Sequence, residues 1–249
     1  MEATGMRNVL IITRREFAGY FATPLAYVFI VIFLALTGAF AFFIGGFFER
    51  GQADLLSFFT YHPWLYLLLV PAVAMRLWAE ERKSGTIELL MTLPITTTEA
   101  VAGKFLAAWA FIGIALGLTA PIWITVNVLG DPDNGVIVAS YLGSFFMAGA
   151  FLAIGSCVSA LTRNQVIAFI VAATVCFLFT MSGIELVLNF FRGWTPEVFI
   201  EVIASLSFLT HFMSVTGGVI DIRDVIYYGS MIAFWLFANV VVVDLRKVA

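Results

Sequence analysis

Six stretches of about 20 residues or more carry no Asp, Glu, Lys or Arg and consist mainly of apolar side chains. They lie at 25–48, 55–75, 105–130, 134–162, 164–184 and 225–243. A helix needs about 20 mostly apolar residues to cross the hydrocarbon core of a bilayer. Adjusting the ends of these stretches predicts spans at about 25–48, 55–78, 100–130, 136–162, 164–190 and 225–243. The predicted fold class is an all-α polytopic membrane protein with six transmembrane helices.

The composition excludes several other classes of protein. Charged residues are only 12% of the 249 residues and hydrophobic residues are 62%, whereas a soluble domain has about 25% charged residues. The net charge of −3 provides no basic surface for nucleic acid. Both cysteines lie in apolar stretches, so no disulfide framework or Cys-rich metal site is indicated. Because the six spans leave only short loops, we predict one transmembrane domain over residues 1–249.

Basic residues predict the orientation, because Lys and Arg near span ends stay on the cytoplasmic side. With six spans, three of the 13 basic residues lie in outer segments, at Arg50, Arg192 and Arg223. The inner segments hold the others: Arg7, Arg14, Arg15, Arg76, Arg82, Lys83, Lys104, Arg163, Arg246 and Lys247. We therefore expect both termini in the cytoplasm.

A seventh stretch, 202–220, is also free of charge but is rich in Ser and Thr and contains the pair Gly217–Gly218. We predict that 194–220 forms helices that enter the outer leaflet and turn back. The alternative is a seventh span, which would place the basic residues near the carboxyl terminus outside.

The amino-terminal segment 4–21 precedes the first span. Its apolar residues fall on one helical face and its arginines fall elsewhere, a pattern typical of a helix that lies on a membrane surface. The apolar set is Met6, Val9, Leu10, Phe17, Tyr20 and Phe21. We predict a cytoplasmic surface helix that ends before Pro24, where the first span begins.

The loop between the second and third spans combines a charged cluster at 80–83 with a short apolar helix. Gly85–Thr86 and Pro94 set the two ends of this helix. Thr96 and Glu99 have the spacing of a capping box at the start of the next helix. Leu89, Leu90 and Leu93 would be exposed on the cytoplasmic side. They mark either a docking site or a contact with the membrane or a neighbouring loop.

At these residues the sequence resembles the ABC-2 type transporter permeases, and most of all their gliding-motility branch; the nitrous-oxide-reductase maturation permease is a more distant likeness. The loop pattern is Glu81-x-x-x-Gly85-Thr86-x-Glu88-Leu89-Leu90-x-x-x-Pro94, followed by Glu99-x-x-x-Gly103-Lys104. Further matching segments are 23–27, Pro63-Trp64, 161–165 and 218–227. The resemblance implies a fold similar to that of type V exporters.

The resemblance also implies roles for particular segments. Residues 86–93 would be a coupling helix in a groove of a separate cytoplasmic ABC ATPase, with Glu81 and Glu88 facing basic groups of that partner. The segment 194–220 would close the exit. The outer-gate candidates are Gly217 and Gly218 in this segment, and Asp221, Arg223 and Asp224 just beyond it. A second permease subunit would complete the path, with a heteromeric pair favoured over a homodimer. The expected location is the bacterial inner membrane, in contact with membrane lipid.

The chain carries no ATPase motif. A phosphate loop needs Gly-x-x-x-x-Gly-Lys-[Ser/Thr], but Gly103–Lys104 is followed by Phe105, and Thr98 stands where the first Gly belongs. We therefore predict that the chain is not an enzyme and holds no cofactor, ATP and Mg²⁺ being bound by the partner. The expected function is that of a permease subunit. The alternative is a membrane scaffold that uses the ATPase for mechanical work.

Two other classes of function would each require particular residues inside the spans. Ser156 with His62 or His211 would be needed for an intramembrane hydrolase, but Gly155, Ser156, Ser159 and Ala160 are more typical of close helix packing. An ion-coupled carrier would need ionisable residues inside the spans. Glu185 alone qualifies, either as part of the outer gate or as a carboxylate that pairs with Arg192.

Overall fold

The computed structural model describes residues 2–92, 94–192, 196–218 and 221–246. Within these ranges the chain forms helices, turns and short loops, with no strand. In chain order the helices are α1 (Glu2–Phe21), α2 (Pro24–Ala39), the π-helix η1 (Phe40–Ile44), α3 (Leu56–Phe59), α4 (His62–Ala74), α5 (Arg76–Ser84), α6 (Thr86–Thr92), α7 (Thr97–Gly117), α8 (Ala120–Leu129), α9 (Asn134–Leu161), α10 (Gln165–Met181), α11 (Glu185–Arg192), α12 (Glu197–Ser205), α13 (Phe208–Thr216) and α14 (Ile222–Leu245). The predicted all-helical fold is confirmed for these residues.

The helix α9 lies at the centre of the bundle. It contacts α4, α5, α7, α10, α13 and α14, and every residue from 147 to 160 is buried. Small side chains allow this close packing. A Cβ atom on Gly155 would stand only 2.4 Å from the Cβ atom of Ala74 in α4. The prediction that the small residues of this span pack against neighbouring helices is therefore confirmed.

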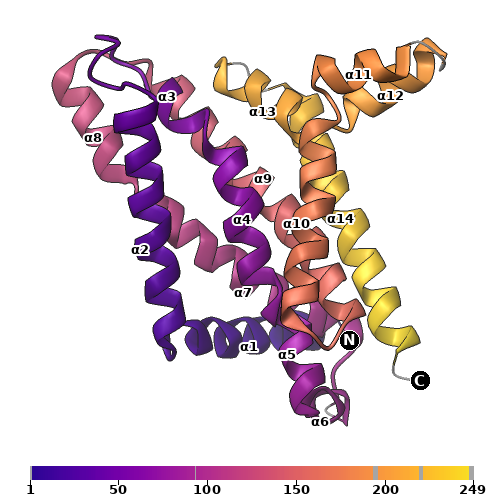
Figure 1. Ribbon diagram of the computed structural model, residues 1–249. Helices are drawn as coiled ribbons and strands as arrows, with labels where there is room; N and C mark the ends of the chain where they lie inside the picture. The colour runs from indigo at the N-terminus through magenta and orange to yellow at the C-terminus, as the bar shows by residue number, and fades with distance from the viewer. Residues whose placement is uncertain (1, 93, 193–195, 219–220, 247–249) are drawn as a thin grey trace.

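Four helical segments of the described chain are long and apolar enough to cross a membrane: Pro24–Ile44, Thr97–Leu129, Asn134–Leu161 and Ile222–Leu245. They correspond to the first, third, fourth and sixth predicted spans. The helix α10 is a shorter apolar helix that runs beside α9 and contacts α4 (Figure 1). The total of six spans stays a prediction.

The second predicted span, 55–78, is not one continuous helix. It contains α3, α4 and the first residues of α5, and it is interrupted at Met75. Pro71 lies inside α4 and cannot donate a backbone hydrogen bond, which weakens the helix at this point. In the sequence Pro71 indicates a weak point of this span, but nothing there indicates that the helix ends at Met75.

The fifth predicted span extends too far, because α10 ends at Met181 and not near residue 190. Residues 182–184 form a turn, and Glu185 then begins the separate helix α11. A Cβ atom on Gly183 would lie 2.4 Å from the Oγ1 atom of Thr210 and 2.6 Å from the Oγ atom of Ser207. The start of α13 therefore packs directly on this turn and sets where α10 ends.

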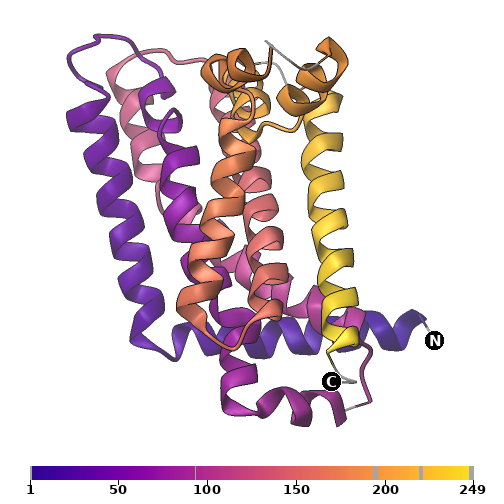
Figure 2. The same cartoon turned by 45° about the vertical axis from the view of Figure 1, so that its right-hand side comes forward.

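The helices α12 and α13 meet at an angle of 62°. Figures 1 and 2 show them with α11 at one end of the bundle, beside the last turn of α10 and the first turn of α14. This arrangement agrees with the predicted re-entrant segment 194–220 rather than with a seventh span. Residues 194–195 and 219–220 of that segment lie outside the described residues.

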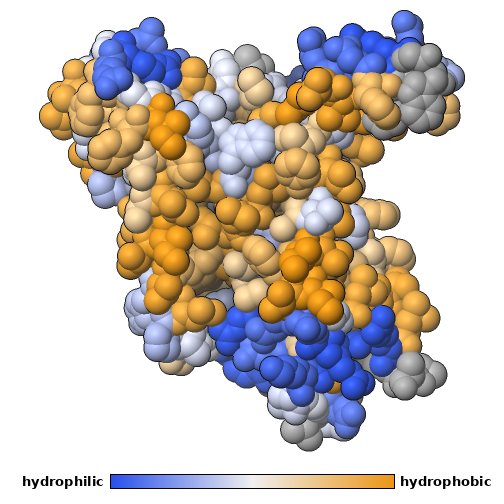
Figure 3. Space-filling view, viewed as in Figure 1, coloured by the Kyte–Doolittle hydropathy of each residue, from blue (hydrophilic) through white to orange (hydrophobic). Residues whose placement is uncertain are grey.

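The opposite end of the bundle carries α1, α5, α6 and the last turn of α14 (Figures 1 and 2). The helix α1 lies across the axes of the other helices, as expected for a surface helix, and packs on α7. We call this end the base. In the space-filling view a hydrophobic middle separates hydrophilic surfaces at the two ends of the molecule (Figure 3).

Candidate functional site

The short helix α6 projects from the base between two backbone breaks. Gly85 ends α5 in the left-handed conformation, with φ of 76° and ψ of 2°, which glycine adopts without steric cost. The helix α6 covers 86–92 of the predicted 86–93, and Leu93 lies outside the described residues. After Pro94, Thr96 and Glu99 form the predicted capping box at the start of α7. Two turns of helix are therefore fixed in place by their flanking sequence.

The predicted contact residues of α6 are only partly described. Thr86 and Glu88 are exposed, and so is Pro94 beyond the helix. The side chains of Leu89 and Leu90 lie outside the described residues. Ile87 is half-buried and packs against the hydrophobic core, which holds one face of α6 on the bundle.

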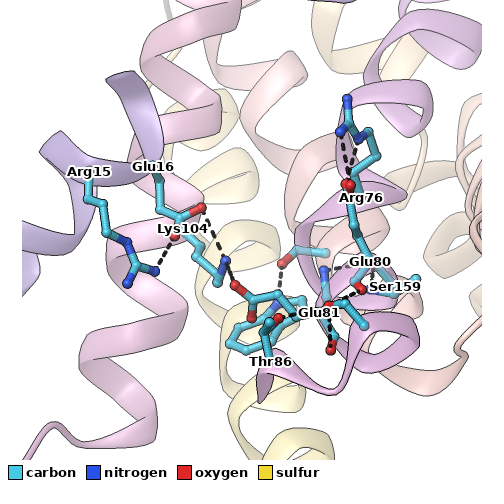
Figure 4. Close-up of polar contacts among 12 residues, drawn as sticks. Arg15, Glu16, Arg76, Glu80, Glu81, Thr86, Lys104 and Ser159 are labelled. Carbon is cyan, nitrogen blue, oxygen red and sulfur yellow. Dashed lines mark hydrogen bonds and ion pairs between the residues drawn. The ribbon is translucent and has the colours of Figure 1, made fainter. Parts of the chain in front are cut away.

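A buried lysine links three helices directly above α6 (Figure 4). Lys104 of α7 is 2% exposed, and its Nζ atom lies 2.7 Å from Glu81 Oε1 of α5 and 3.2 Å from Glu16 Oε2 of α1. The same Nζ atom stands 5.5 Å from the ring centre of Trp78, within range of a cation–π interaction. We call Glu16, Glu81 and Lys104 the lysine junction. It ties α1 and α7 to the helix that carries α6.

The lysine junction changes the role expected for Glu81. The resemblance assigned this carboxylate to basic groups of a partner, but the structure turns it toward Lys104 of the same chain. A cation buried this deeply needs a counter-charge nearby. Sequence reasoning missed Glu16 and Lys104 as site residues. The signal available in the sequence was a lysine in the second turn of an apolar helix. In the structure the preceding residue, Gly103, packs closely on α1, because a Cβ atom there would lie 2.6 Å from the side chain of Ile12.

Two serines of α9 form hydrogen bonds with the start of α5. The Oγ atom of Ser159 accepts hydrogen bonds of 3.1 Å from the backbone N–H groups of Trp78 and Ala79, and donates one of 2.9 Å to the carbonyl of Met75. These backbone groups are the ones that the break between α4 and α5 leaves without helical partners. Ser159 therefore stabilises the break and holds α5 against α9.

The hydroxyl group of the nearby Ser156 also forms hydrogen bonds within the bundle. Its Oγ atom accepts hydrogen bonds from Trp78 Nε1 at 3.2 Å and from Asn239 Nδ2 of α14 at 2.7 Å. The two histidines lie elsewhere: His62 contacts Ser144, and His211 contacts Asp224. The described geometry therefore does not support a Ser156–His pair, and the serine serves helix packing.

Two carboxylates near the base, Glu16 and Glu80, have lowered pKa values. Burial raises the pKa of Glu16, but the charges of Lys104 and Arg15 together lower it more, so that it lies below its usual 4.5. The pKa of Glu80 is lowered mainly by its hydrogen bond from Arg76 (Figure 4). Both groups bind fewer protons in the folded chain than in the unfolded chain. Their stabilising contribution is complete above pH 4.5 and is lost as the pH falls below it.

We therefore expect Glu16→Gln to reduce the acid sensitivity of the purified protein. The wild-type melting temperature should fall as the pH is lowered through 4.5, and the variant should show a shallower fall because one carboxylate with a lowered pKa is gone. Thermal melts across this pH range measure the effect, with Glu197→Gln at an exposed position of α12 as the control. Parallel pH profiles for wild type and Glu16→Gln would contradict the assignment.

At the opposite end, a histidine–aspartate pair joins the re-entrant helices to α14. His211 Nδ1 of α13 lies 2.6 Å from Asp224 Oδ1, and Nε2 lies 3.0 Å from the carbonyl oxygen of Ser205. Because a carbonyl only accepts, Nε2 carries a proton. The ring also stacks on Tyr227 at 3.9 Å. Asp224 therefore anchors α13 to α14 through Oδ1, whereas its Oδ2 atom is buried without a hydrogen-bond partner among the described residues.

The other outer-gate candidates have different positions. Asp221 caps α14 by accepting from the N–H of Arg223, whose side chain is exposed. Gly217 ends α13, and Gly218, with φ of 90°, packs against Val136. The structure thus brings these residues together with Asp224 where α13 meets α14.

Glu185 does not share that location. It is exposed in the first turn of α11, which packs on α12. The sequence left open an ion pair between Glu185 and Arg192. In the structure Arg192 Nη1 instead donates a hydrogen bond of 2.8 Å to Asn189 Oδ1. Sequence spacing alone placed Glu185 inside a span because it gave no sign of the turn at 182–184.

Comparisons with known proteins match most of the bundle. The profile of the family described as ABC-2 family transporter protein covers residues 68–243. Heme exporter protein B of Paracoccus denitrificans is 32% identical over 155 residues, which are 61% of this chain and 66% of that protein. Heme exporter protein B of Rhodobacter capsulatus is 29% identical over 157 residues, with coverages of 59% and 68%.

A second kind of relative matches a shorter region. The probable multidrug ABC transporter permease YbhS of Escherichia coli (strain K12) is 34% identical over 101 residues, which are 40% of this chain and 26% of that permease. The chain thus spans about two thirds of the length of the heme exporter proteins and about a quarter of the length of this permease.

Proposed function

The chain belongs to the ABC-2 family of transporter proteins, and from this premise we propose that it is the transmembrane permease subunit of an ATP-binding cassette transporter. A separate cytoplasmic ATPase would bind and hydrolyse ATP with Mg²⁺, because the sequence has no phosphate loop. The names of the relatives, two exporter proteins and a permease, favour transport over a purely mechanical scaffold. The likeness to the gliding-motility branch remains part of this proposal.

The observation that carries the proposal is the placement of α6. This two-turn helix projects from the base, with exposed Thr86 and Glu88, and its supporting helix α5 is held by the lysine junction and by Ser159. Such a helix is short enough to enter a groove and is attached firmly enough to transmit force. We propose it as the coupling helix that docks on the ATPase.

The charges around α6 support a docking surface of this kind. Arg82 of α5 has a lowered pKa, first because of its burial and then because of the nearby positive charges of Arg246 and Arg163. An acidic surface placed against these three arginines would reduce the electrostatic repulsion among them. We propose that this basic cluster faces acidic groups of the ATPase beside the α6 contact.

The proposed path of force follows the contacts between the helices. A push on α6 reaches α5, from where Ser159 and Ser156 lead to α9 and α14, and the lysine junction leads to α1 and α7. At the far end, the His211–Asp224 pair connects α14 to the re-entrant helices. Motion at the base would thereby change the position of the proposed outer gate.

We extend the proposal to the second subunit of the transporter and to its location in the cell. A second permease subunit, a different chain or a copy of this one, would form the path at the interface. The proposed location is the bacterial inner membrane with the base in the cytoplasm, because the basic residues of the predicted inner segments gather there. Both termini would then be cytoplasmic.

The docking proposal is tested on α6. Leu89→Asp combined with Leu90→Asp should reduce the co-purification of a co-expressed ATP-binding cassette ATPase by about tenfold or more, because two buried charges oppose an apolar contact. Leu186→Asp on exposed α11 is the matched control at the opposite end, and it should leave the association unchanged. Size-exclusion profiles verify that both variants fold. Unchanged recovery of the ATPase with the double variant would refute the coupling role of α6.

A further inference from the structure

A cavity of about 410 Å³ opens between α1, α2, α4, α5 and α7. Figure 3 faces the hollow between α2 and α4, above the level of α1. The volume lies within the range of sites that bind small molecules, about 300–1,000 Å³. The path of force described above does not use this cavity, although the lysine junction forms part of its wall.

The cavity is apolar along most of its depth. Its walls include Val28 and Ile32 of α2 and Leu69 and Val73 of α4. Along α2 the lining runs from Leu25 to Ile32, a rise of about 10 Å. This distance is shorter than one bilayer leaflet, whose hydrocarbon thickness is about 15 Å. A hydrocarbon chain that follows α2 from the base would therefore remain within the inner half of the membrane.

The end of the cavity nearest the base is polar and carries both signs of charge. Arg76 donates to Glu80 through Nε and Nη2, at 2.7 Å and 3.1 Å, and these two bonds do not use its Nη1 atom. The side chains of Arg76 and Glu80 keep 31% and 47% of their surface exposed. A ligand can therefore reach a guanidinium and a carboxylate that lie side by side at the mouth of an apolar cavity.

We propose that this cavity binds a zwitterionic phospholipid of the inner leaflet, with an ammonium group in its head. The phosphate would accept from Arg76 Nη1, the ammonium would donate to Glu80, and one acyl chain would lie between α2 and α4. Arginine is well suited to phosphate, and a head with both charges matches the paired charges of the mouth. The proposal rests on the membrane embedding of the bundle and on the proposed cytoplasmic position of the base, and not on docking to an ATPase.

Gly19 of α1 offers a way to close the cavity without disturbing the fold. It lines the cavity, and a Cβ atom there would meet nothing within 4 Å. Gly19→Leu should therefore place its side chain in the space of the ligand while improving the local helix propensity. Gly229 of α14 is a matched control, because a Cβ atom there also meets nothing within 4 Å and it does not line the cavity.

The test uses the full chain in nanodiscs of dioleoylphosphatidylglycerol with a trace of phosphatidylethanolamine that carries a diazirine in one acyl chain. After illumination, mass spectrometry maps the labelled residues. We expect labelling concentrated on α2 and α4, lowered about tenfold by Gly19→Leu and by Glu80→Gln, and unchanged by Gly229→Leu. Unlabelled phosphatidylethanolamine should compete, and added phosphatidylglycerol should not.

Three results would overturn the proposal. Labelling spread evenly over all apolar helices would mean annular lipid only. Labelling of α2 and α4 that survives Gly19→Leu would place the lipid outside the cavity. Equal competition by the anionic phosphatidylglycerol would remove the role of the paired charges at the mouth. None of these results bears on ATPase docking, which is measured separately on α6.

Discussion

Lys104→Met is expected to lower the free energy of unfolding by about 3–5 kcal/mol, the usual cost of removing one partner from a buried ion pair. The substitution keeps an unbranched side chain, one atom shorter, but removes the cation between Glu16 and Glu81. Glu16 keeps its ion pair with Arg15, whereas Glu81 loses its ion pair. Unfolding can be followed through the thiols of Cys157 and Cys176, which are both buried in the folded chain and react with a maleimide dye once exposed. The variant should expose these thiols at a lower temperature and at a lower concentration of denaturing detergent.

Two further variants separate the buried charge from general effects of the substitution. Lys83→Met changes an exposed lysine of the neighbouring α5, and it should alter stability by no more than about 0.5 kcal/mol. Adding Glu16→Gln and Glu81→Gln to Lys104→Met removes the uncompensated carboxylates, so this triple variant should recover most of the lost stability. A single Lys104→Met variant as stable as Lys83→Met would show that the lysine junction does not hold the base together.

Gly155→Ala is expected to destabilise the bundle by about 1–3 kcal/mol, because overpacking a tight helix contact forces the backbone to shift. The added methyl group would stand 2.4 Å from the Cβ atom of Ala74, and neither group can rotate away. The helices α9 and α4 must therefore separate. The same thiol assay measures the loss, and Cys157 lies only two residues along α9 from the substituted site.

The compensating change is Ala74→Gly. Combined with Gly155→Ala, it removes the clashing methyl group, so the double variant should regain most of the lost stability, less the helix propensity of a glycine in α4. Gly229→Ala is the control for adding a methyl group where a Cβ atom meets nothing within 4 Å. If Gly155→Ala were tolerated as well as Gly229→Ala, the close approach of α4 and α9 would be wrong.

Features that depend on local chemistry were predicted well from the sequence. The capping box of Thr96 and Glu99 was found where its spacing placed it, because a cap involves only neighbouring backbone groups. The predicted surface helix 4–21 corresponds to α1, and the short helix predicted at 86–93 corresponds to α6 through residue 92. Four long apolar runs became helices of spanning length.

Features that depend on contacts between distant helices were not predicted. The end of α10 at Met181 follows from the packing of Ser207 and Thr210 against Gly183, and an apolar run carries no sign of that contact. The break at Met75 is stabilised by a hydroxyl group 84 residues further along the chain, that of Ser159. The candidate site shows the same division: the position of α6 was predicted, but the partner of Glu81 was not.

The sequence by itself determined that this chain is a helical membrane bundle, because hydropathy over about 20 residues, charge at the span ends and helix caps are all local properties. It also lacks a phosphate loop, from which we predict that ATP is hydrolysed by another subunit. Only the tertiary structure decided which charged and polar side chains meet. Lys104 could be paired with Glu16 and Glu81, and Asp224 with His211, only once the helices were packed. A buried charge takes the counter-charge that the fold brings within about 4 Å, and separation along the sequence does not reveal that distance.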